Sequence, residues 1–134
     1  MSEFSNAERS AGSIVYEPYQ DERQLREISV LVAGELSEPY SVFTYRYFLV
    51  QWPELCICAY DCSIESKPLI GAIICKVETE ADGLKKGYIG MLVVDKKYRG
   101  SGIGSELVKS GIRKMIAAGS DEIFLETEVM LPCL

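Results

Sequence analysis

Histidine is absent from this sequence of 134 residues, and tryptophan occurs only once. Without histidine, the chain cannot form a Ser-His-Asp triad, a Cys-His nucleophile pair or a histidine metal site. The five cysteines also lack the paired Cys-x-x-Cys spacing of a zinc knuckle, so we expect free thiols and no metal. Any catalysis must then use carboxylates, tyrosines, thiols or backbone groups.

Long apolar runs are lacking too. The densest apolar segment, Leu69–Cys75, falls far short of the roughly 18 residues that span a bilayer. The first residues are polar and acidic and contain no apolar signal core. We therefore expect a cytoplasmic protein with no membrane partner. The length fits a single domain over residues 13–134, preceded by a disordered tail at residues 1–12.

Positive charge is scarce and unevenly distributed. Residues 1–82 hold 14 Asp and Glu against 6 Lys and Arg, whereas residues 83–134 hold 6 against 8. Such a chain lacks the broad basic face that duplex DNA requires, so no DNA partner is expected. The local cluster of Lys96, Lys97 and Arg99 suits one small polyanion, such as a phosphorylated cofactor. A solvated basic loop is the alternative.

The hydrophobic pattern predicts eight elements in the order β-α-α-β-β-β-α-β. The expected strands are Ile14–Tyr19, Leu55–Cys62, Leu69–Thr79, Gly87–Asp95 and Glu122–Val129. The first helix follows a capping box formed by Asp21 and Gln24, and the second lies in the aromatic-rich residues 40–52. The third has one apolar face that includes Ile103, Leu107, Ile112, Met115 and Ile116.

A glycine-rich segment, residues 99–104, connects the fourth predicted strand to the third helix. Glycines let backbone N–H groups approach an anion, and the helix N-terminus adds a partial positive charge, so the segment predicts a pyrophosphate site. It is not a P-loop, because no Gly-Lys-Ser/Thr closes it. A dinucleotide fingerprint is disfavoured by the antiparallel hairpins before it. The alternative is that this segment is a glycine-rich connector that binds no ligand.

This segment, Arg99-Gly100-Ser101-Gly102-Ile103-Gly104, resembles the acetyl-CoA motif of the GNAT acetyltransferases. Other strings resemble, more narrowly, the catalytic subunit of the NatC-type N-terminal acetyltransferases. They are Leu36-Ser37-Glu38-Pro39-Tyr40-Ser41, Tyr45-Arg46-Tyr47-Phe48, Gln51-Trp52-Pro53-Glu54-Leu55, Gly87-Tyr88-Ile89-Gly90-Met91-Leu92 and Leu125-Glu126-Thr127-Glu128. The resemblance implies an α/β fold of the GNAT type, in which helices flank a mixed, mostly antiparallel sheet.

The resemblance also implies the reaction: an acetyl group passes from acetyl-CoA to the α-amine of proteins that begin with Met and a bulky hydrophobic residue. Pyrophosphate would lie on the backbone of Arg99, Gly100, Ser101, Gly102, Ile103 and Gly104, and pantetheine along Met91, Leu92 and Val93. Glu126 is implied as the general base, and Glu38, Tyr40 and Tyr88 as the binding site for the peptide N-terminus. The implied partners are nascent chains, auxiliary subunits of a NatC-type complex and the ribosome.

The residues themselves leave these roles open. An α-amine has a pKa near 8 and must lose a proton before it attacks, which suits a carboxylate at a strand end. Glu128 lies two residues after Glu126 on the same predicted face and is the rival base. Glu38 is also compatible with a solvated turn, and Tyr88 with half-buried packing.

The family pattern continues after Val129 into another helix and two strands, whereas five residues follow Val129 here. We therefore expect an incomplete fold that lacks the final helix and strands, arising from a truncated isoform, a gene model or a fragment. Little or no activity is expected of such a chain. A non-catalytic chain that binds auxiliary subunits is one alternative, and a GNAT enzyme acting on a small amine is another.

Overall fold

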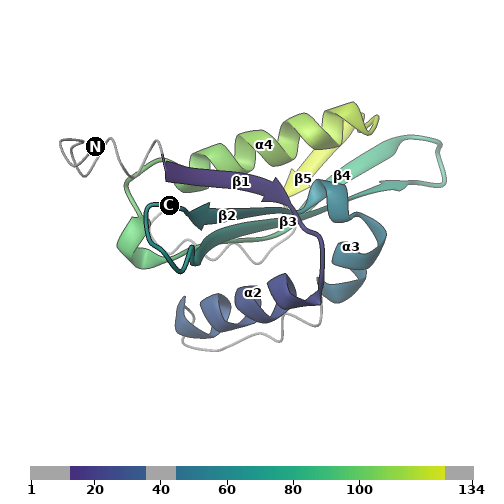
Figure 1. Ribbon diagram of the computed structural model, residues 1–134. Coiled ribbons are helices and arrows are strands. Elements are labelled where there is room, and N and C mark those ends of the chain that lie inside the picture. The colour runs from purple at the N-terminus through teal and green to yellow at the C-terminus, as the bar shows by residue number, and fades with distance from the viewer. Residues whose placement is uncertain (1–12, 36–44, 126–134) are drawn as a thin grey trace.

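A computed structural model describes residues 13–35 and 45–125 (Figure 1). Its strands are β1 (Ile14–Pro18), β2 (Ile57–Asp61), β3 (Leu69–Thr79), β4 (Lys85–Val94) and β5 (Glu122–Leu125). Its helices are α2 (Glu22–Glu35), α3 (Arg46–Gln51) and α4 (Ile103–Ala117), with 3-10 turns η2 (Pro53–Leu55) and η3 (Lys96–Tyr98). The predicted order of elements is thus confirmed over the described residues. The tail predicted at residues 1–12 lies outside them.

The strands form one sheet in the order β1-β2-β3-β4-β5. The first four strands pair antiparallel, with short connections between β2, β3 and β4 and with α2 and α3 between β1 and β2, and β5 pairs parallel to β4. Parallel pairing requires a crossover, and α4 supplies it. The mixed, mostly antiparallel sheet predicted from the sequence is therefore confirmed.

Helices cover both faces of the sheet, with α2 and α4 on opposite sides (Figure 1). On β4, Met91 and Val93 pack with the α2 side, whereas Leu92 and Val94 pack with α4. This alternation follows from the two-residue period of a strand, and because both faces are covered there, β4 is continuously apolar from Met91 to Val94. Each strand residue near the centre of β4 therefore belongs to one of two separate hydrophobic clusters.

The helix α2 begins at the predicted capping box. The Asp21 carboxylate accepts a hydrogen bond from the Arg23 N–H at 3.0 Å, and the Gln24 side-chain oxygen accepts one from the Asp21 N–H at 3.2 Å. These contacts satisfy N–H groups that have no partner within the helix. The cap thus fixes the start of a helix whose other end, Glu35, lies beside η3.

The helix α4 packs on the sheet through Ile103, Leu107, Gly111 and Met115, which recur every four residues. A Cβ atom on Gly111 would lie 3.2 Å from the Cys75 sulfur, so the glycine allows close approach of helix and sheet. The prediction that Ile116 shares this face is wrong, because Ile116 is 59% exposed. The buried stripe drifts around the helix, and Ile116 lies beyond its edge in the last turn.

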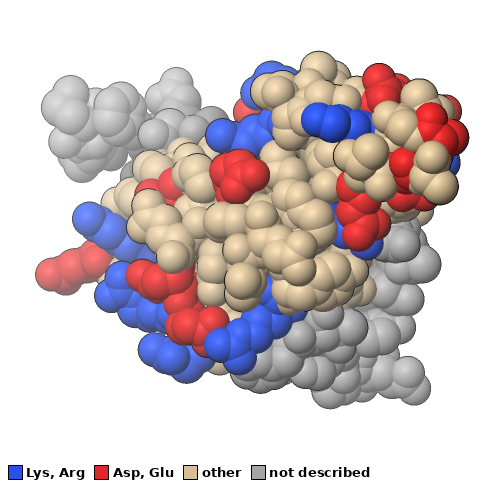
Figure 2. Space-filling view, turned by 90° about the vertical axis from the view of Figure 1, so that its right-hand side faces the viewer, with Lys and Arg blue, Asp and Glu red and all other residues tan. Residues whose placement is uncertain are grey.

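No helix among residues 13–35 and 45–125 is long and apolar enough to cross a membrane. On the face shown in Figure 2, acidic and basic side chains are interspersed around an uncharged band. That face carries no broad basic surface.

Candidate active site

A β-bulge interrupts β4 at Gly90. The register with β3 pairs Ile74 with Met91 and Cys75 with Ile89, which leaves Gly90 as the extra residue. A Cβ atom there would lie 3.1 Å from the Phe48 ring, so the close approach of α3 requires glycine. Bulges bend a strand and occur often beside active sites. The bend falls just after Ile89, where the described pairing of β4 with β5 ends.

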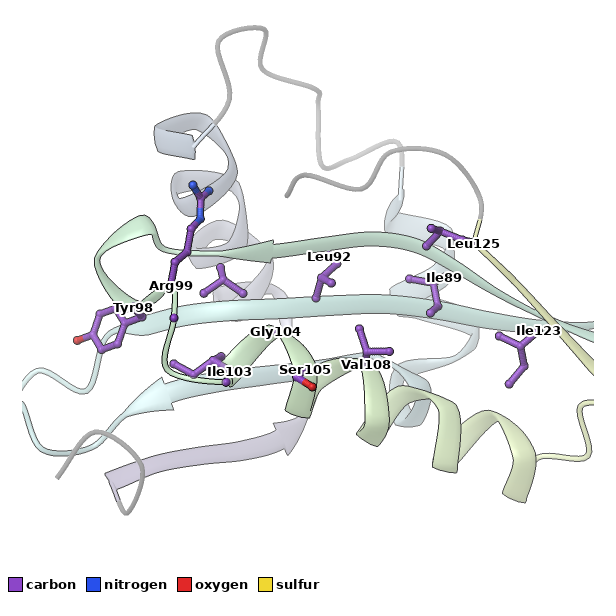
Figure 3. Close-up of a pocket in the computed structure, with 13 residues that line it drawn as sticks. Ile89, Leu92, Tyr98, Arg99, Ile103, Gly104, Ser105, Val108, Ile123 and Leu125 are labelled. Carbon is purple, nitrogen blue, oxygen red and sulfur yellow. The ribbon is translucent and has the colours of Figure 1, made fainter. Parts of the chain in front are cut away.

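An apolar cleft of about 680 Å³ opens between β4, β5 and the start of α4 (Figure 3). Its walls are Ile89, Leu92 and Val94 from β4, Ile123 and Leu125 from β5, and Ile103, Gly104, Ser105 and Val108 from α4, with Tyr98, Arg99, Gly100 and Gly102 at the connecting loop. β4 continues to Val94 without a partner strand among the described residues on this side. The cleft can therefore receive an extended chain with an apolar body and a polar end.

The polar end of the cleft is the loop before α4. Gly100 and Gly102 have φ values of +86° and +83°, which only glycine adopts without strain. The first hydrogen bond at the start of α4 joins the Glu106 N–H to the Gly102 carbonyl at 3.0 Å. The N–H groups of Ile103, Gly104 and Ser105 precede it and have no partner within the helix, as at every helix N-terminus. Together with the helix dipole, these N–H groups are suited to bind an anion at the mouth of the cleft.

The Arg99 side chain does not supply this anion site with its charge. Its guanidinium points away from Ser105 and Val108 (Figure 3) and lies 2.7 Å from the Glu35 carboxylate. The Arg99 N–H is also used, since it donates to the Lys96 carbonyl at 3.3 Å. Lys96 and Lys97 are exposed. Among the residues predicted to bind pyrophosphate, Arg99 is therefore already engaged. The glycine-rich residues that follow Arg99 are the ones open to a ligand.

The other flank of η3 is held by Asp61 at the end of β2. The Tyr98 hydroxyl donates to the Asp61 carboxylate at 2.5 Å. Burial, followed by this hydrogen bond and the charge of Asp61, raises the pKa of Tyr98 to about 12. Tyr98 therefore stays protonated at neutral pH and keeps its place as a hydrogen-bond donor.

Tyr88 lies on the α3 side of the sheet, because it contacts Lys76 beside the α3 rings and alternates with Ile89, which faces the cleft. Its ring stacks on Phe124 of the neighbouring strand, with centroids 5.7 Å apart and planes 27° apart. The cleft opens on the α4 side of the same two strands. Tyr88 and the cleft are therefore separated by the thickness of β4, on opposite faces of the sheet.

Lys76 is the chemically unusual residue that the sequence analysis missed. It pairs with Tyr88 across the β3–β4 ladder, and its ammonium lies 5.1–5.4 Å from the ring centroids of Tyr47, Phe48 and Tyr88. It also donates to the Tyr47 hydroxyl and pairs with Glu78, both at 3.1 Å. Burial alone lowers the pKa of Lys76, but these partners outweigh burial and raise it. The signal in the sequence was a lone lysine within an apolar strand.

The other predicted site residues fall into three groups. Leu92, Arg99, Gly100, Gly102, Ile103 and Gly104 line the cleft. The side chains of Met91 and Val93 point to the opposite face, Ser101 does not line the cleft, and Tyr88 lies on the α3 side. Glu38, Tyr40 and Glu126 lie outside the described residues. Ile89, Tyr98, Ser105, Val108 and Ile123 also line the cleft and were not predicted as site residues.

The buried cysteines are poor candidates for a metal site or a nucleophile. Cys56, Cys58 and Cys75 are buried and free, and Cys62 is exposed and free. Within the described part of the chain, no group of three or more acidic, cysteine or histidine residues is arranged to hold a metal. Burial raises the pKa of Cys56 and Cys58 to about 12. These thiols are therefore protonated and unreactive at neutral pH.

Comparison with known proteins agrees with this fold. The model of the acetyltransferase (GNAT) family matches residues 12–130, so the chain belongs to the GNAT acetyltransferase family. Within it, the chain is similar to N-alpha-acetyltransferase 30 of Dictyostelium discoideum, with 51% identity over 93% of this chain, and to that of Homo sapiens, with 44% identity over 87%. Its fold is also similar to a chain in the crystal structure of the NatC complex bound to Gag peptide and CoA. That match has 46% identity and a TM-score of 0.79, and covers 87% of this chain and 75% of that chain.

The chain is shorter than these relatives. It covers 65% of the Dictyostelium protein and 31% of the human protein.

Proposed function

We propose that this chain transfers the acetyl group of acetyl-CoA to the α-amine of protein N-termini, as the catalytic subunit of a NatC-type complex. The observation that carries the proposal is the cleft: an apolar channel between β4 and β5 that ends on unpaired helix N–H groups. Acetyl-CoA has the matching chemistry: the methyl and methylene groups of its pantetheine arm suit the apolar walls, the amides of that arm suit the free edge of β4, and its pyrophosphate is an anion. A relative at 46% identity is a chain of the NatC complex whose crystal structure is bound to Gag peptide and CoA.

The chain's own residues bind and orient acetyl-CoA in this proposal. The N–H groups between Gly100 and Ser105 hold the pyrophosphate, and Ile89, Leu92 and Val108 exclude water from the pantetheine arm. The backbone of Met91, Leu92 and Val93, just after the bulge, offers the N–H that polarises the thioester carbonyl. When bound, acetyl-CoA supplies an activated acyl group. Orientation of this group against the amine provides most of the rate enhancement.

The amine arrives from the other face of the sheet. We place the peptide N-terminus beside Tyr88, on the α3 side of β4, with Glu38 and Tyr40 as further contacts. Tyr88 is directly followed by Ile89, which lines the cleft on the other face, and by the bulge at Gly90, so β4 connects the two sites. Chains that begin with Met followed by a bulky hydrophobic residue are the proposed substrates, because the Glu38–Tyr40 string resembles that of NatC-type enzymes.

Proton removal is assigned to Glu126. It follows Leu125 at the end of β5, and Leu125 lines the cleft. Glu126 accepts the proton of the α-ammonium, the amine nitrogen attacks the thioester carbonyl carbon, and the carbon–sulfur bond breaks to release CoA. Direct attack is supported by the buried, protonated thiols of Cys56, Cys58 and Cys75, which do not serve as nucleophiles. The partners in this proposal are nascent chains and auxiliary subunits in the cytoplasm, at the ribosome.

The test uses the 134-residue chain, alone and with purified auxiliary subunits of a NatC-type complex. It is supplied with acetyl-CoA and a peptide that begins Met-Leu, a matched peptide that begins Ser-Leu, or a polyamine. With the auxiliary subunits present, mass spectrometry should detect one acetyl group on the α-amine of the Met-Leu peptide and much less on the other two substrates.

Two results would favour the alternatives instead. Acetylation of the polyamine in preference to both peptides would indicate a small-amine acetyltransferase. Binding of auxiliary subunits without turnover in either preparation would indicate a non-catalytic subunit.

A further inference from the structure

Glu35, the last residue of α2, contacts the loop that precedes α4. One carboxylate oxygen lies 2.7 Å from the Arg99 guanidinium, and the other accepts a hydrogen bond from the Lys96 N–H at 3.2 Å. The side chain of Glu35 is 8% exposed and that of Arg99 is 26% exposed. Both oxygens of this largely buried carboxylate therefore contact η3 or Arg99, the residue that follows it.

This contact determines where Arg99 points. The Nε atom of Arg99 is buried and has no hydrogen-bond partner within the described part of the chain. Leaving such a donor unsatisfied is unfavourable, so the pairing with Glu35 at the other end of the guanidinium must hold the side chain in place. The side chain is turned away from the cleft (Figure 3), and the neighbouring glycine-rich backbone is left free to face it.

We infer that Glu35 is a positioning residue for the pyrophosphate site, and this inference rests on the proposed function. Glu35 fixes Lys96 and Arg99 from the α2 side, while Asp61 fixes Tyr98 from the β2 side. Both carboxylates act on η3, which ends just before Gly100. The N–H groups from Gly100 to Ser105 are therefore held in the geometry that binds an anion before any ligand arrives. Neither carboxylate touches the ligand itself.

The inference predicts a selective loss of CoA affinity when Glu35 is changed. Glu35→Ala removes both contacts and should weaken CoA binding by about tenfold or more, because the loop must then be ordered during binding. Glu35→Gln retains an acceptor for the Lys96 N–H and loses only the charge, so its loss should be smaller. The matched control is Val32→Ala, on the same helix, which removes buried apolar contacts away from the loop.

Two measurements decide the matter. Calorimetric titration with CoA should give affinities in the order wild type, Glu35→Gln and Glu35→Ala, with Val32→Ala equal to wild type despite its lower melting temperature. Amide hydrogen exchange without ligand should be faster at residues 96–99 in Glu35→Ala than in Val32→Ala. CoA affinity unchanged in Glu35→Ala, or unchanged exchange at residues 96–99, would overturn the inference.

These measurements also separate this inference from the proposed function. A wild-type chain that binds no CoA would remove the cofactor assignment. The exchange measurement would still show whether Glu35 orders the loop, so the two failures are distinguishable. If Glu35→Ala does not fold, the Glu35→Gln variant carries the same comparison.

Discussion

At the scale of single residues, the proposed reaction depends on one carboxylate. Glu126 follows β5 directly, and Glu128 lies two residues further on. Because a general base typically contributes 10²–10⁴-fold to rate, Glu126→Gln should lower kcat by about that factor while acetyl-CoA affinity changes little.

The matched control for Glu126 is Glu128→Gln, which should lower kcat far less. Steady-state rates with the Met-Leu peptide and calorimetry with CoA measure both quantities in the chain that shows turnover. A larger loss in Glu128→Gln than in Glu126→Gln would show that Glu128 is the base.

Lys76 carries a prediction about stability. Its methylene groups and ammonium are enclosed by Tyr47, Phe48 and Tyr88, and only 10% of the side chain is exposed. Lys76→Ala should lower the free energy of unfolding by about 2–4 kcal/mol, from lost apolar burial and lost cation–π contacts. Lys76→Met keeps most of the buried stem and should cost about 1 kcal/mol.

Chemical denaturation measures these differences, with Lys109→Ala as the control. Lys109 is exposed on α4, so its removal should change the free energy of unfolding by less than about 0.5 kcal/mol. If Lys76→Ala were as mild as Lys109→Ala, the aromatic enclosure would contribute nothing to stability.

At the scale of elements, the loop before α4 carries the next prediction. Gly102 has a φ of +83°, and a Cβ atom built on it meets no atom of the protein within 4 Å. The cost of Gly102→Val therefore comes from the strained backbone and from a side chain directed into the ligand's space. We expect CoA binding to weaken by at least about 1–3 kcal/mol.

Gly34→Ala is the matched control for Gly102. Gly34 also has open space around its Cβ position, but it lies in α2, where alanine is favoured by about 0.5–1 kcal/mol. Calorimetry should show wild-type CoA affinity in Gly34→Ala and a large loss in Gly102→Val. Equal affinities in all three chains would place the anion site elsewhere.

The elements themselves could be predicted because their signals are local. Periodicity over a few residues fixed the strands, and Asp21 with Gln24 marked the start of α2 as the structure confirms. The bulge at Gly90 could not be predicted, because it depends on the register between β3 and β4 and on the Phe48 ring from another element. The pairing of Glu35 with Arg99 joins residues 64 positions apart and leaves no local pattern.

At the scale of the whole molecule, the sheet separates two kinds of chemistry. The α4 side holds the apolar cleft and the anion site, and the α3 side holds Tyr88 and Lys76. Sequence motifs pointed to residues of both sites, but they did not show that the two sites lie on opposite faces of the sheet. That arrangement follows from the alternation along β4 together with the bulge.

The buried thiols give the whole molecule a predicted pH dependence. Burial raises the pKa of Cys56 and Cys58 from an ordinary value of 9.0 to about 12, and it raises that of Cys75 further. A raised folded pKa means that the unfolded chain releases these protons first. Stability from the neutral thiols is therefore fully present below pH 9 and is lost as pH rises from 9 toward the folded pKa values.

The expected size of this loss is about 1.4 kcal/mol for each thiol per pH unit above 9, or about 4 kcal/mol for the three thiols at pH 10. Since a domain has only ~5–15 kcal/mol of stability, most of it should disappear near pH 10–11. The raised pKa of Tyr98, about 12 against an ordinary 10.0, acts in the same direction above pH 10.

Urea denaturation at pH 7, 9 and 10, with a reductant present, measures how steeply the free energy of unfolding falls with pH. A Cys58→Ala, Cys75→Ala double variant should be less stable at pH 7 and should show about one third of the thiol slope, whereas Val32→Ala should be less stable with the full slope. A double variant that kept the wild-type slope would mean that other groups, and not these thiols, set the alkaline limit of the fold.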